Sequence, residues 1–206
     1  MTKMELYRVV NSVFTSNSYV LSAEGDEAIL IDVGDFQPIE RYLKVHKKKV
    51  KAVFLTHTHY DHIYGIRELV KNYPRCRVYT SAFGKEALAS DRLNFSRYHN
   101  DAFRWEYEHL QILNDGDQIE IFPTVGLEVM ATPGHDKSCL TYRVGRYLFS
   151  GDSFIPQVKV IASFPQSSKK EAQSSLQRIL AVADGCYLCP GHGPVYKDFK
   201  LSQIPL

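Results

Sequence analysis

Short runs of apolar residues, broken by glycine, proline and polar clusters, dominate the hydrophobic pattern of this chain. Runs of four to eight such residues are typical of buried strands, whereas longer stretches with apolar residues three and four apart favour helices. We expect strands at 5–10, 15–22, 28–32, 51–56, 76–80, 118–122, 127–131, 140–144, 147–150 and 187–189. We expect helices at 37–48, 63–70 and 83–89, and a longer one that begins near Ser168.

Three local signals refine this outline. Ser168-x-x-Glu171 is a capping box, in which two side chains satisfy free backbone N–H groups at a helix start. Asp35 is a candidate cap for the helix at 37–48, which has Pro38 in its first turn. Residues 90–108 are the least periodic stretch and mix polar with aromatic side chains, which fits either a lid over a substrate or an ordinary packed loop.

The expected strands come in two batches, each interleaved with helices. No linker rich in proline, glycine or serine divides the chain. This order predicts an α/β fold in which mixed sheets are covered by helices. We therefore expect residues 1–206 to form one domain.

The most informative stretch is an apolar run that ends abruptly in histidines and aspartate. Residues 53–55 are Val-Phe-Leu, and Thr56-His57-Thr58-His59-Tyr60-Asp61-His62 follow at once. Residues two apart in an extended chain point the same way, so His57 and His59 share a side. Neutral imidazoles and a carboxylate are the donors that divalent metals take. The spacing therefore predicts a metal site at the end of a buried strand.

Three later positions repeat this arrangement. His135, Asp152 and His192 each follow an apolar run and a glycine. Glycine lets the backbone turn sharply and approach its neighbours closely. Open α/β sheets place their sites at strand ends, so these residues are expected to join the first cluster. Asp32 ends a further apolar run in the same way.

Composition excludes little and is ordinary for a soluble globular protein. Of the 206 residues, 44% are hydrophobic and 23% are charged, and the formal net charge is +2. So small a charge does not argue for nucleic acid. The basic run at 47–51 is interpreted as a solvated helix end. No apolar stretch is long enough to span a bilayer, and residues 1–5 lack the apolar core of a signal peptide, so a cytoplasmic protein is expected.

The four cysteines are interpreted as structural. Without an export signal, disulfides are not expected. Cys186-x-x-Cys189 has the spacing of a redox motif or a zinc knuckle, but no second pair completes a four-thiolate site. Small, buried residues of a strand are the interpretation that we favour.

Together these motifs resemble the metallo-β-lactamase superfamily, most closely its glyoxalase II-like hydrolases. The stretch from Thr56 to His62 matches the signature motif, and Asp32 matches the acidic residue of the first motif. Thr132-Pro133-Gly134-His135, Ser150-Gly151-Asp152 and Pro190-Gly191-His192-Gly193 match the third, fourth and fifth motifs in order. The resemblance implies an αββα sandwich of two mixed β-sheets flanked by helices, with a dinuclear metal site between the sheets.

The resemblance also implies a ligand set. The first metal would be bound by His57, His59 and His135, the second by Asp61, His62 and His192, and Asp152 would bridge the two. Asp32 would orient a ligand or the loop. Zinc is the expected metal, with iron or manganese as alternatives. His46 and His109 match no motif and are expected at the surface, whereas His99 is a candidate for the pocket.

A metal-dependent hydrolase of a small carbonyl ester, thioester or lactone is the function that follows. Two cations about 3.5–4 Å apart hold a bridging water and lower its pKa toward about 7, and the resulting hydroxide attacks the carbonyl carbon. Asp61 and Asp152 would be the catalytic carboxylates, with Asp61 orienting the hydroxide. A small-molecule substrate is the partner expected, and the oligomeric state is left open.

Two other enzymes share much of this motif. One is a persulfide dioxygenase-like oxidoreductase, in which a single iron would be held by His57, His135 and Asp152. The other is a nuclease or phosphodiesterase, against which the near-neutral charge argues. A non-catalytic binding module is disfavoured because every ligand is retained.

Departures from the family pattern bear on the substrate. Asp136 follows His135 where relatives have threonine, and Tyr64 replaces a small residue. Residues 153–159 lack the Cys-Gly-Lys/Arg-aromatic segment by which glyoxalase II holds glutathione. The chain also ends about a dozen residues after His192, without the C-terminal helical domain of those enzymes. The candidate substrate-pocket residues are Tyr60, Tyr64, Asn94, Asp136 and Lys159.

Overall fold

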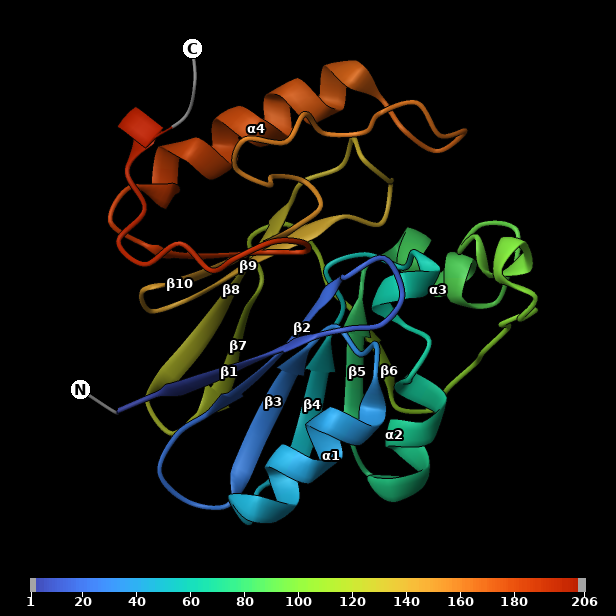
Figure 1. Ribbon diagram of the computed structural model, residues 1–206, viewed down its shortest axis with the longest axis vertical. Helices are drawn as coiled ribbons and strands as arrows, with labels where there is room; N and C mark the ends of the chain where they lie inside the picture. The colour runs from blue at the N-terminus through green and yellow to red at the C-terminus, as the bar shows by residue number, and fades with distance from the viewer. Residues whose placement is uncertain (1–2, 204–206) are drawn as a thin grey trace.

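The computed structural model describes residues 3–203, and within them two β-sheets pack against each other (Figure 1). The first sheet contains, in spatial order, β1 (Glu5–Val10), β2 (Asn17–Ser22), β3 (Glu27–Ile31), β4 (Lys49–Phe54), β5 (Arg77–Thr80) and β6 (Leu110–Ile112). The second contains β11 (Tyr187–Pro190), β10 (Tyr147–Gly151), β9 (Leu140–Val144), β8 (Val125–Ala131) and β7 (Gln118–Phe122).

Both sheets are mixed. In the first sheet β1, β2 and β3 pair antiparallel, whereas β3, β4, β5 and β6 run parallel. In the second sheet β7 to β10 pair antiparallel, and β11 runs parallel to β10. Parallel strands have their carboxyl ends at one edge of a sheet. The polar segments that follow β3 and β4 therefore meet at one edge, as do those that follow β10 and β11.

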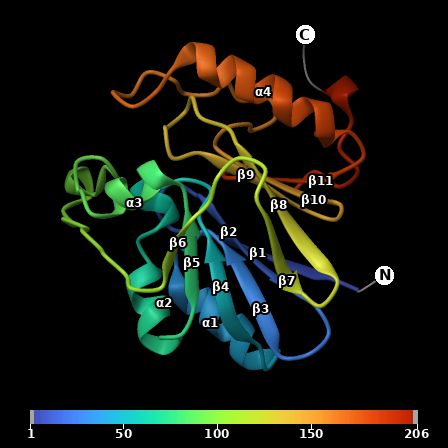
Figure 2. The ribbon, with the colours of Figure 1, turned by 180° about the vertical axis from the view of Figure 1, so that it is seen from behind.

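Helices cover the outer face of each sheet (Figures 1 and 2). The first sheet packs against α1 (Phe36–Val45) and α2 (Ile66–Asn72), whose Ile39, Leu43 and Leu69 are fully buried. The second sheet packs against α4 (Lys169–Ala183) through Ile179 and Ala183. A short α3 (Ala82–Leu88) follows β5. The layers run helix, sheet, sheet, helix, which confirms the predicted sandwich.

A third apolar layer lies between the two sheets. It includes Ile29 and Phe54 from the first sheet and Leu127, Tyr142 and Phe149 from the second, all fully buried. Burial of a large apolar side chain contributes roughly 1.5–3 kcal/mol. This inner layer holds the two sheets in register, so the loops at their common edge face one another.

Most expected elements are present within a few residues of their predicted ends, with two exceptions. β6 was not predicted, because Leu-Gln-Ile is too short an alternating run to indicate a strand, and two of its residues are exposed at the edge of the sheet. The helix expected from residue 63 begins only at Ile66, since Tyr60–His62 form a 3-10 turn (η1). The capping box is confirmed, because the Ser168 hydroxyl accepts the Glu171 N–H.

Asp35 lies at the start of α1, but its side chain does not cap the helix as predicted. Its carboxylate instead accepts the Ser12 N–H at 2.7 Å and the Tyr64 hydroxyl at 2.6 Å. Asp35 therefore joins the loop between β1 and β2 to the segment before α2. The basic run at 47–51 is not a helix end as predicted, because α1 ends at Val45 and Lys49 and Lys51 lie on β4, where they pair with Asp26 and Glu27.

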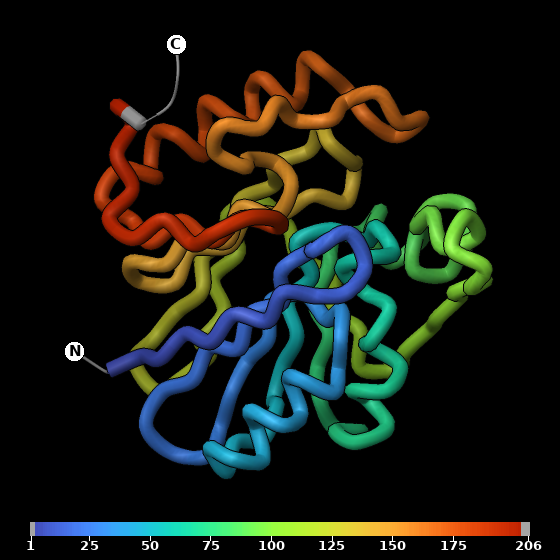
Figure 3. Tube along the Cα trace, in the orientation of Figure 1, coloured from blue at the N-terminus to red at the C-terminus, as the bar shows by residue number. Residues whose placement is uncertain are grey.

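The loop between β1 and β2 lies beside the segment that follows β11 (Figure 3). Ser16 pairs with His192 through an isolated bridge, and the Asn17 amide donates to the carbonyls of Pro190 and Gly193. A segment near the N-terminus of the chain and one near its C-terminus therefore lie side by side at this edge of the sandwich. No helix within residues 3–203 is long and apolar enough to cross a membrane.

Candidate metal centre

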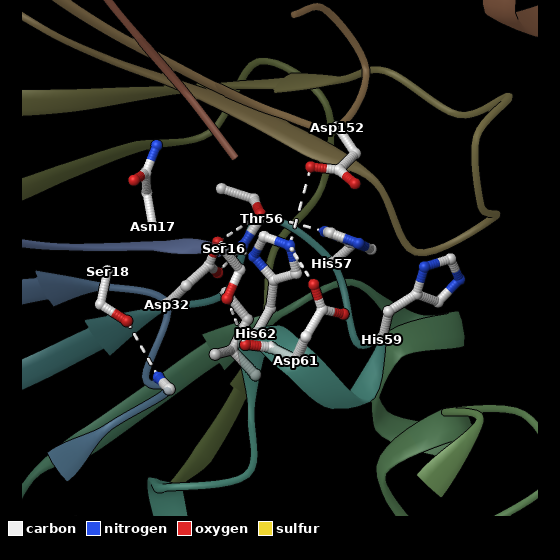
Figure 4. Close-up of polar contacts among 12 residues, drawn as sticks. Ser16, Asn17, Ser18, Asp32, Thr56, His57, His59, Asp61, His62 and Asp152 are labelled. Carbon is white, nitrogen blue, oxygen red and sulfur yellow. Dashed lines mark hydrogen bonds and ion pairs between the residues drawn. The ribbon is translucent and has the colours of Figure 1, made fainter. Parts of the chain in front are cut away.

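Seven side chains of metal-binding type converge where strands of both sheets end. His57 and His59 follow β4, Asp61 and His62 lie on η1, His135 follows β8, and Asp152 and His192 follow β10 and β11. Figure 4 shows Asp152 reaching from the second sheet toward His62 and Asp61, which come from the first. The ends of the strands thus bring together residues as far apart in the sequence as His57 and His192.

The donor atoms fall into three overlapping groups, each with its atoms within 4.8 Å of one another. The groups are His57, His59 and His135; His57, His62 and Asp152; and Asp61, His62 and His192. The first and third have the same members as the two ligand sets expected from the sequence. Assignment of a metal to each group remains a proposal.

Asp152 lies between the groups. Its Oδ1 is 3.6 Å from Nε2 of His62, and its Oδ2 is 3.6 Å from Nε2 of His135 and 3.4 Å from Nε2 of His192. Asp61 also approaches two histidines, at 3.4 Å from Nε2 of His62 and 3.3 Å from Nε2 of His192. A carboxylate with an oxygen toward each group has the geometry of a bridging ligand.

Several of these buried atoms have no hydrogen-bond partner within residues 3–203. Those that face the cluster are Nε2 of His57, Nε2 of His62 and Oδ1 of Asp152. An unpaired buried polar atom costs about 1–3 kcal/mol, so native structures rarely keep several together. Lone pairs of nitrogen and oxygen that face a common space fit divalent cations, and the residues present therefore suit a metal pair.

A second set of contacts fixes the rings. Nδ1 of His62 lies 2.9 Å from Oδ2 of Asp32, and the same carboxylate accepts both the backbone N–H and the hydroxyl of Thr56. Nδ1 of His135 donates to the Ile161 carbonyl, and Nδ1 of His192 to the Phe14 carbonyl. These bonds direct Nε2 of each ring toward the cluster.

Sequence reasoning found Asp32 but missed most of these partners. The carbonyls of Phe14 and Ile161 are backbone atoms, which leave no signal in the sequence. Ser16 was also missed, although its hydroxyl donates to the Asp61 carbonyl at 2.7 Å. Buried polar residues in an expected hairpin were the available signal, and Asn17 and Ser18 belong to the same group.

The carboxylates of the cluster stabilise positive charge on the side chains next to them. Burial lowers the pKa of His62 and His192, but the carboxylates around them prevail and raise the pKa to about 9 for His62 and about 10 for His192. Burial likewise works against ionisation of Asp61 and Asp152, yet the neighbouring histidines keep both pKa values below the ordinary range. Burial lowers the pKa of His57 and His135, so these rings stay neutral and able to donate lone pairs.

Gly191 is required by close approach to the cluster. A Cβ atom at this position would overlap Oδ1 of Asp152 and lie 3.0 Å from the His62 ring. Its carbonyl also accepts the Asn17 N–H at 2.7 Å. The glycine that precedes His192 therefore lets β11 approach the site, as its place in the sequence suggested.

Aromatic side chains form one wall of the site. Phe95 and Phe164 contact the His59 ring edge-on, with centroid distances of 4.8 and 5.5 Å, and lie 5.1 Å from each other. Phe164 also contacts His135. We name Phe95 and Phe164 the aromatic wall. Phe95 has φ 62°, a left-handed conformation that is strained for a bulky residue and is frequent at functional sites.

The five candidate pocket residues have different surroundings. Tyr60 donates its hydroxyl to Asp101, and burial together with that carboxylate raises its pKa to about 12. The Tyr64 pKa is raised to about 12 by burial and Asp35, so this phenol also stays neutral. Asp136 is buried beside His59, with 3.6 Å between Oδ2 and Nε2, and not against His135 as its sequence position suggested.

Asn94 and Lys159 lie outside the cluster. Asn94 is fully buried, and its amide donates to the carbonyls of Ala87 and Phe103, so it braces the loop and offers no polar atom to a substrate. Lys159 is exposed and lines a groove of about 730 Å³ between residues 154–163 and α4. The groove adjoins the centre through Ile161, whose carbonyl holds His135.

The remaining histidines and the cysteines are not among the metal-type groups of residues 3–203. His46 is exposed, His109 is half-exposed, and His99 stacks on Tyr60 at 4.7 Å. The four cysteines are free and buried, and burial raises the pKa of the Cys186 and Cys189 thiols. Raised pKa values make these thiols poor nucleophiles at neutral pH.

Comparison with known proteins gives the class. The family model of the metallo-beta-lactamase superfamily matches residues 11–192, and the chain belongs to this superfamily.

A particular relative is the hydroxyacylglutathione hydrolase of Salmonella typhi, which is 26% identical over 189 residues, covering 91% of this chain and 66% of that protein. The chain thus spans just under two thirds of the length of the curated relatives that it matches.

Two solved structures have the same fold. The BLEG-1 B3 metallo-beta-lactamase superposes with a TM-score of 0.85 at 24% identity, covering 93% of each chain. TTHA1623, crystallised in a di-iron-bound form, gives a TM-score of 0.80 at 23% identity, covering 93% of this chain and 94% of that chain. At these identities the likeness concerns the fold alone.

Proposed function

We propose that this protein hydrolyses a small carbonyl ester, thioester or lactone, using two divalent metal ions, with zinc as the expected metal. One observation carries the proposal. Three groups of metal-type donors share one space, and three buried atoms that face it, Nε2 of His57, Nε2 of His62 and Oδ1 of Asp152, have no hydrogen-bond partner within residues 3–203. The similarity to a hydroxyacylglutathione hydrolase supports a thioester among the substrates.

Seven residues would hold the metals. His57, His59 and His135 would bind one ion, Asp61, His62 and His192 the other, and Asp152 both. When bound, the ions supply a water of lowered pKa and polarise the substrate carbonyl. No serine or cysteine nucleophile is required, which agrees with the raised pKa of the buried cysteine thiols.

The chain's own carboxylates would act on the attacking water. Oδ2 of Asp61 lies 3.3 Å from Nε2 of His192, at the boundary between the two expected ligand sets. The neighbouring histidines keep this carboxylate ionised. From this position Asp61 would accept a proton and aim the water at the carbonyl carbon, and Asp152 would hold the two halves of the site at a fixed separation.

The aromatic wall supports a substrate with an apolar acyl group. Phe95 and Phe164 present apolar surface on the His59 side of the cluster, and an acyl group packed against them would displace water there. Removal of water strengthens electrostatic interactions within a site. The near-neutral charge of the chain gives no reason to expect a polyanionic substrate.

The cytoplasmic location and the single domain over residues 1–206 stay predictions.

Metal analysis followed by a substrate panel tests the proposal. Protein purified without added metal is expected to contain two metal ions per chain by elemental analysis. The zinc-, iron- and manganese-loaded proteins are then offered thioesters, lactones and β-lactams, and hydrolysis of at least one carbonyl substrate is expected. If fully loaded protein cleaves none of them, the substrate class is wrong.

One outcome would favour the oxidoreductase instead. A single iron per chain, together with oxygen uptake on a persulfide, would replace the hydrolase. The di-iron form of the fold neighbour TTHA1623 makes iron a metal worth testing from the start.

A further inference from the structure

His59 is oriented differently from the other histidines of the cluster. Nδ1 of His62, His135 and His192 is taken by Asp32, the Ile161 carbonyl and the Phe14 carbonyl, so Nε2 of each faces the cluster. In His59 the ring is reversed. Its Nδ1 lies 3.0 Å from Nε2 of His135, inside the cluster, and its Nε2 points out of it.

The outward nitrogen of His59 faces a buried carboxylate. Asp136 is only 1% exposed, and its Oδ2 lies 3.6 Å from Nε2 of His59. Neither atom has a hydrogen-bond partner within residues 3–203. Two unpaired buried polar atoms of opposite character, placed opposite each other, are poised to pair with a small movement of the ring.

The other oxygen of Asp136 is fully engaged. Oδ1 accepts the N–H and the hydroxyl of Ser138, and the Ser138 hydroxyl oxygen accepts the N–H of Thr58, which lies between His57 and His59. This connection anchors the carboxylate to the backbone beside His59. Asp136 cannot turn toward solvent without breaking these bonds, so Oδ2 is kept aimed at the His59 ring.

We propose that Asp136 is a positioning residue that accepts the Nε2–H of His59 and fixes the tautomer in which Nδ1 presents its lone pair to a metal. The chemistry of imidazole requires such a partner. A neutral ring that donates a lone pair from Nδ1 carries its proton on Nε2, and a buried N–H needs an acceptor. The inference rests on the metal pair of the proposed function and concerns one of its ligands.

The Asp136 carboxylate places a negative charge next to the group formed by His57, His59 and His135. A carboxylate that accepts from a ligating imidazole orients the ring and raises its basicity, and loss of such a partner typically costs tenfold to a hundredfold in metal affinity. The other ring partners in this half of the site are neutral, namely Thr56 at His57 and the Ile161 carbonyl at His135. Asp136 therefore distinguishes His59 as the most strongly supported ligand of its group.

Asp136→Asn tests this role because it keeps the size of the side chain and removes the charge. Zinc and cobalt affinities of the full-length protein are measured by competition with a chelator. The affinity of the group formed by His57, His59 and His135 for the metal is expected to fall tenfold to a hundredfold. In metal-free protein, the ¹⁵N shifts of the His59 ring are expected to change from a defined tautomer toward a mixture. The absorption bands of the cobalt-loaded protein should shift as well.

Two control variants distinguish an effect of Asp136 on the His59 ring from a general effect on the stability of the fold. Lys137→Ala removes an exposed charge from the adjacent residue and should leave affinity, ring shifts and cobalt spectrum unchanged. Ser138→Ala removes the link to Thr58 and one of the two bonds to Oδ1 but keeps the carboxylate and the bond from the Ser138 N–H, so it should lower the melting temperature and change the His59 shifts less than Asp136→Asn does.

Wild-type ring shifts and wild-type affinity in Asp136→Asn would overturn the inference. A wild-type protein that binds no metal would overturn the metal centre itself, which is a separate failure of the proposed function. Hydrolysis is not used as a readout, so the choice of substrate has no bearing on the outcome.

Discussion

The carboxylate of Asp32 and the Nδ1 nitrogen of His62 lie 2.9 Å apart, and both residues are buried from solvent. The pairing joins the end of β3 to the turn that follows β4. The same carboxylate also accepts two hydrogen bonds from Thr56, so it serves both a proposed ligand and the backbone that leads to the others.

Asp32→Asn should therefore weaken the second metal group. The amide keeps the shape of the side chain but removes the charge and one acceptor, so we expect metal affinity to fall about tenfold to a hundredfold. Asparagine is the suitable change because residue 32 has φ 58°, a conformation that asparagine and aspartate tolerate better than alanine. Chelator competition measures the affinity.

Asp26→Asn is the matched control, since Asp26 is an exposed aspartate paired only with a surface lysine. It should leave metal affinity unchanged and the melting temperature close to that of the wild type. Equal metal affinity in Asp32→Asn and the control would show that Asp32 does not support the centre.

Asp152→Ala should abolish binding of the metal pair. The carboxylate lies within 3.6 Å of three histidine nitrogens from both expected ligand sets, and its loss removes the group proposed to hold both ions. Elemental analysis after dialysis against a weak chelator gives the stoichiometry. Glu106→Ala, a change at an exposed acidic residue, should retain two ions. Two tightly bound ions in Asp152→Ala would refute the bridging assignment.

Phe95→Ala should change which substrates are preferred, because it removes part of the aromatic wall. We expect kcat/KM for substrates with a large apolar acyl group to fall about tenfold or more, with little change for the smallest acyl groups. Metal content should not change. Tyr98→Ala, at a neighbouring residue that is 72% exposed, is the control. A uniform loss over all substrates would argue against a role in specificity.

The backbone at residue 95 allows a second comparison. Alanine keeps the strain of φ 62°, whereas glycine adopts this conformation freely. Phe95→Gly should therefore be more stable than Phe95→Ala by roughly 1 kcal/mol, a difference that thermal unfolding can resolve. A less stable glycine variant would indicate that the loop conformation is not strained.

The metal-free protein should lose stability as the pH rises through about 9 to 10. The pKa values of His62 and His192 are raised in the folded state, to about 9 and about 10, so their protonated forms stabilise the fold. This contribution is fully present below the ordinary histidine pKa of about 6.5 and is lost as the pH passes the raised values. Melting temperatures of chelator-treated protein between pH 6 and pH 10 measure it.

His192→Gln provides the control for other groups that titrate in that range. Its metal-free form should show a smaller decline between pH 8 and pH 10 than the wild type. With metal the sign reverses, because protons compete with the ions for the same nitrogens. The increase in melting temperature on metal addition should therefore grow with pH.

The residues that gather at the candidate metal centre could be predicted from the sequence because they follow the ends of buried strands. His57, His135 and Asp152 each come after an apolar run, and the sheets then bring these ends together regardless of their separation along the chain. The predicted sandwich was correct for the same reason, since its strands are short and strongly apolar. β6 escaped because only its pairing with β5 defines it.

The contacts that orient the ligands could not be predicted. Carbonyl acceptors such as that of Ile161 depend on how a loop returns to the site, not on residue type. Asp136 illustrates the limit, because its neighbour in the sequence is His135 while its neighbour in space is His59. The turn from Pro133 to Ser138, where Gly134 has φ 137°, directs the carboxylate to the other histidine.

The ligands of each proposed metal come from both sheets, and this has a consequence for the kinetics of folding. His57 needs His135 beside it, and His62 needs His192, so neither group exists until distant segments have paired. Such long-range contacts form late. Metal binding would therefore be largely absent from the folding transition state, and the ions would slow unfolding far more than they accelerate folding. In this protein the metal pair would stabilise the native state kinetically, and its loss would shorten the lifetime of that state.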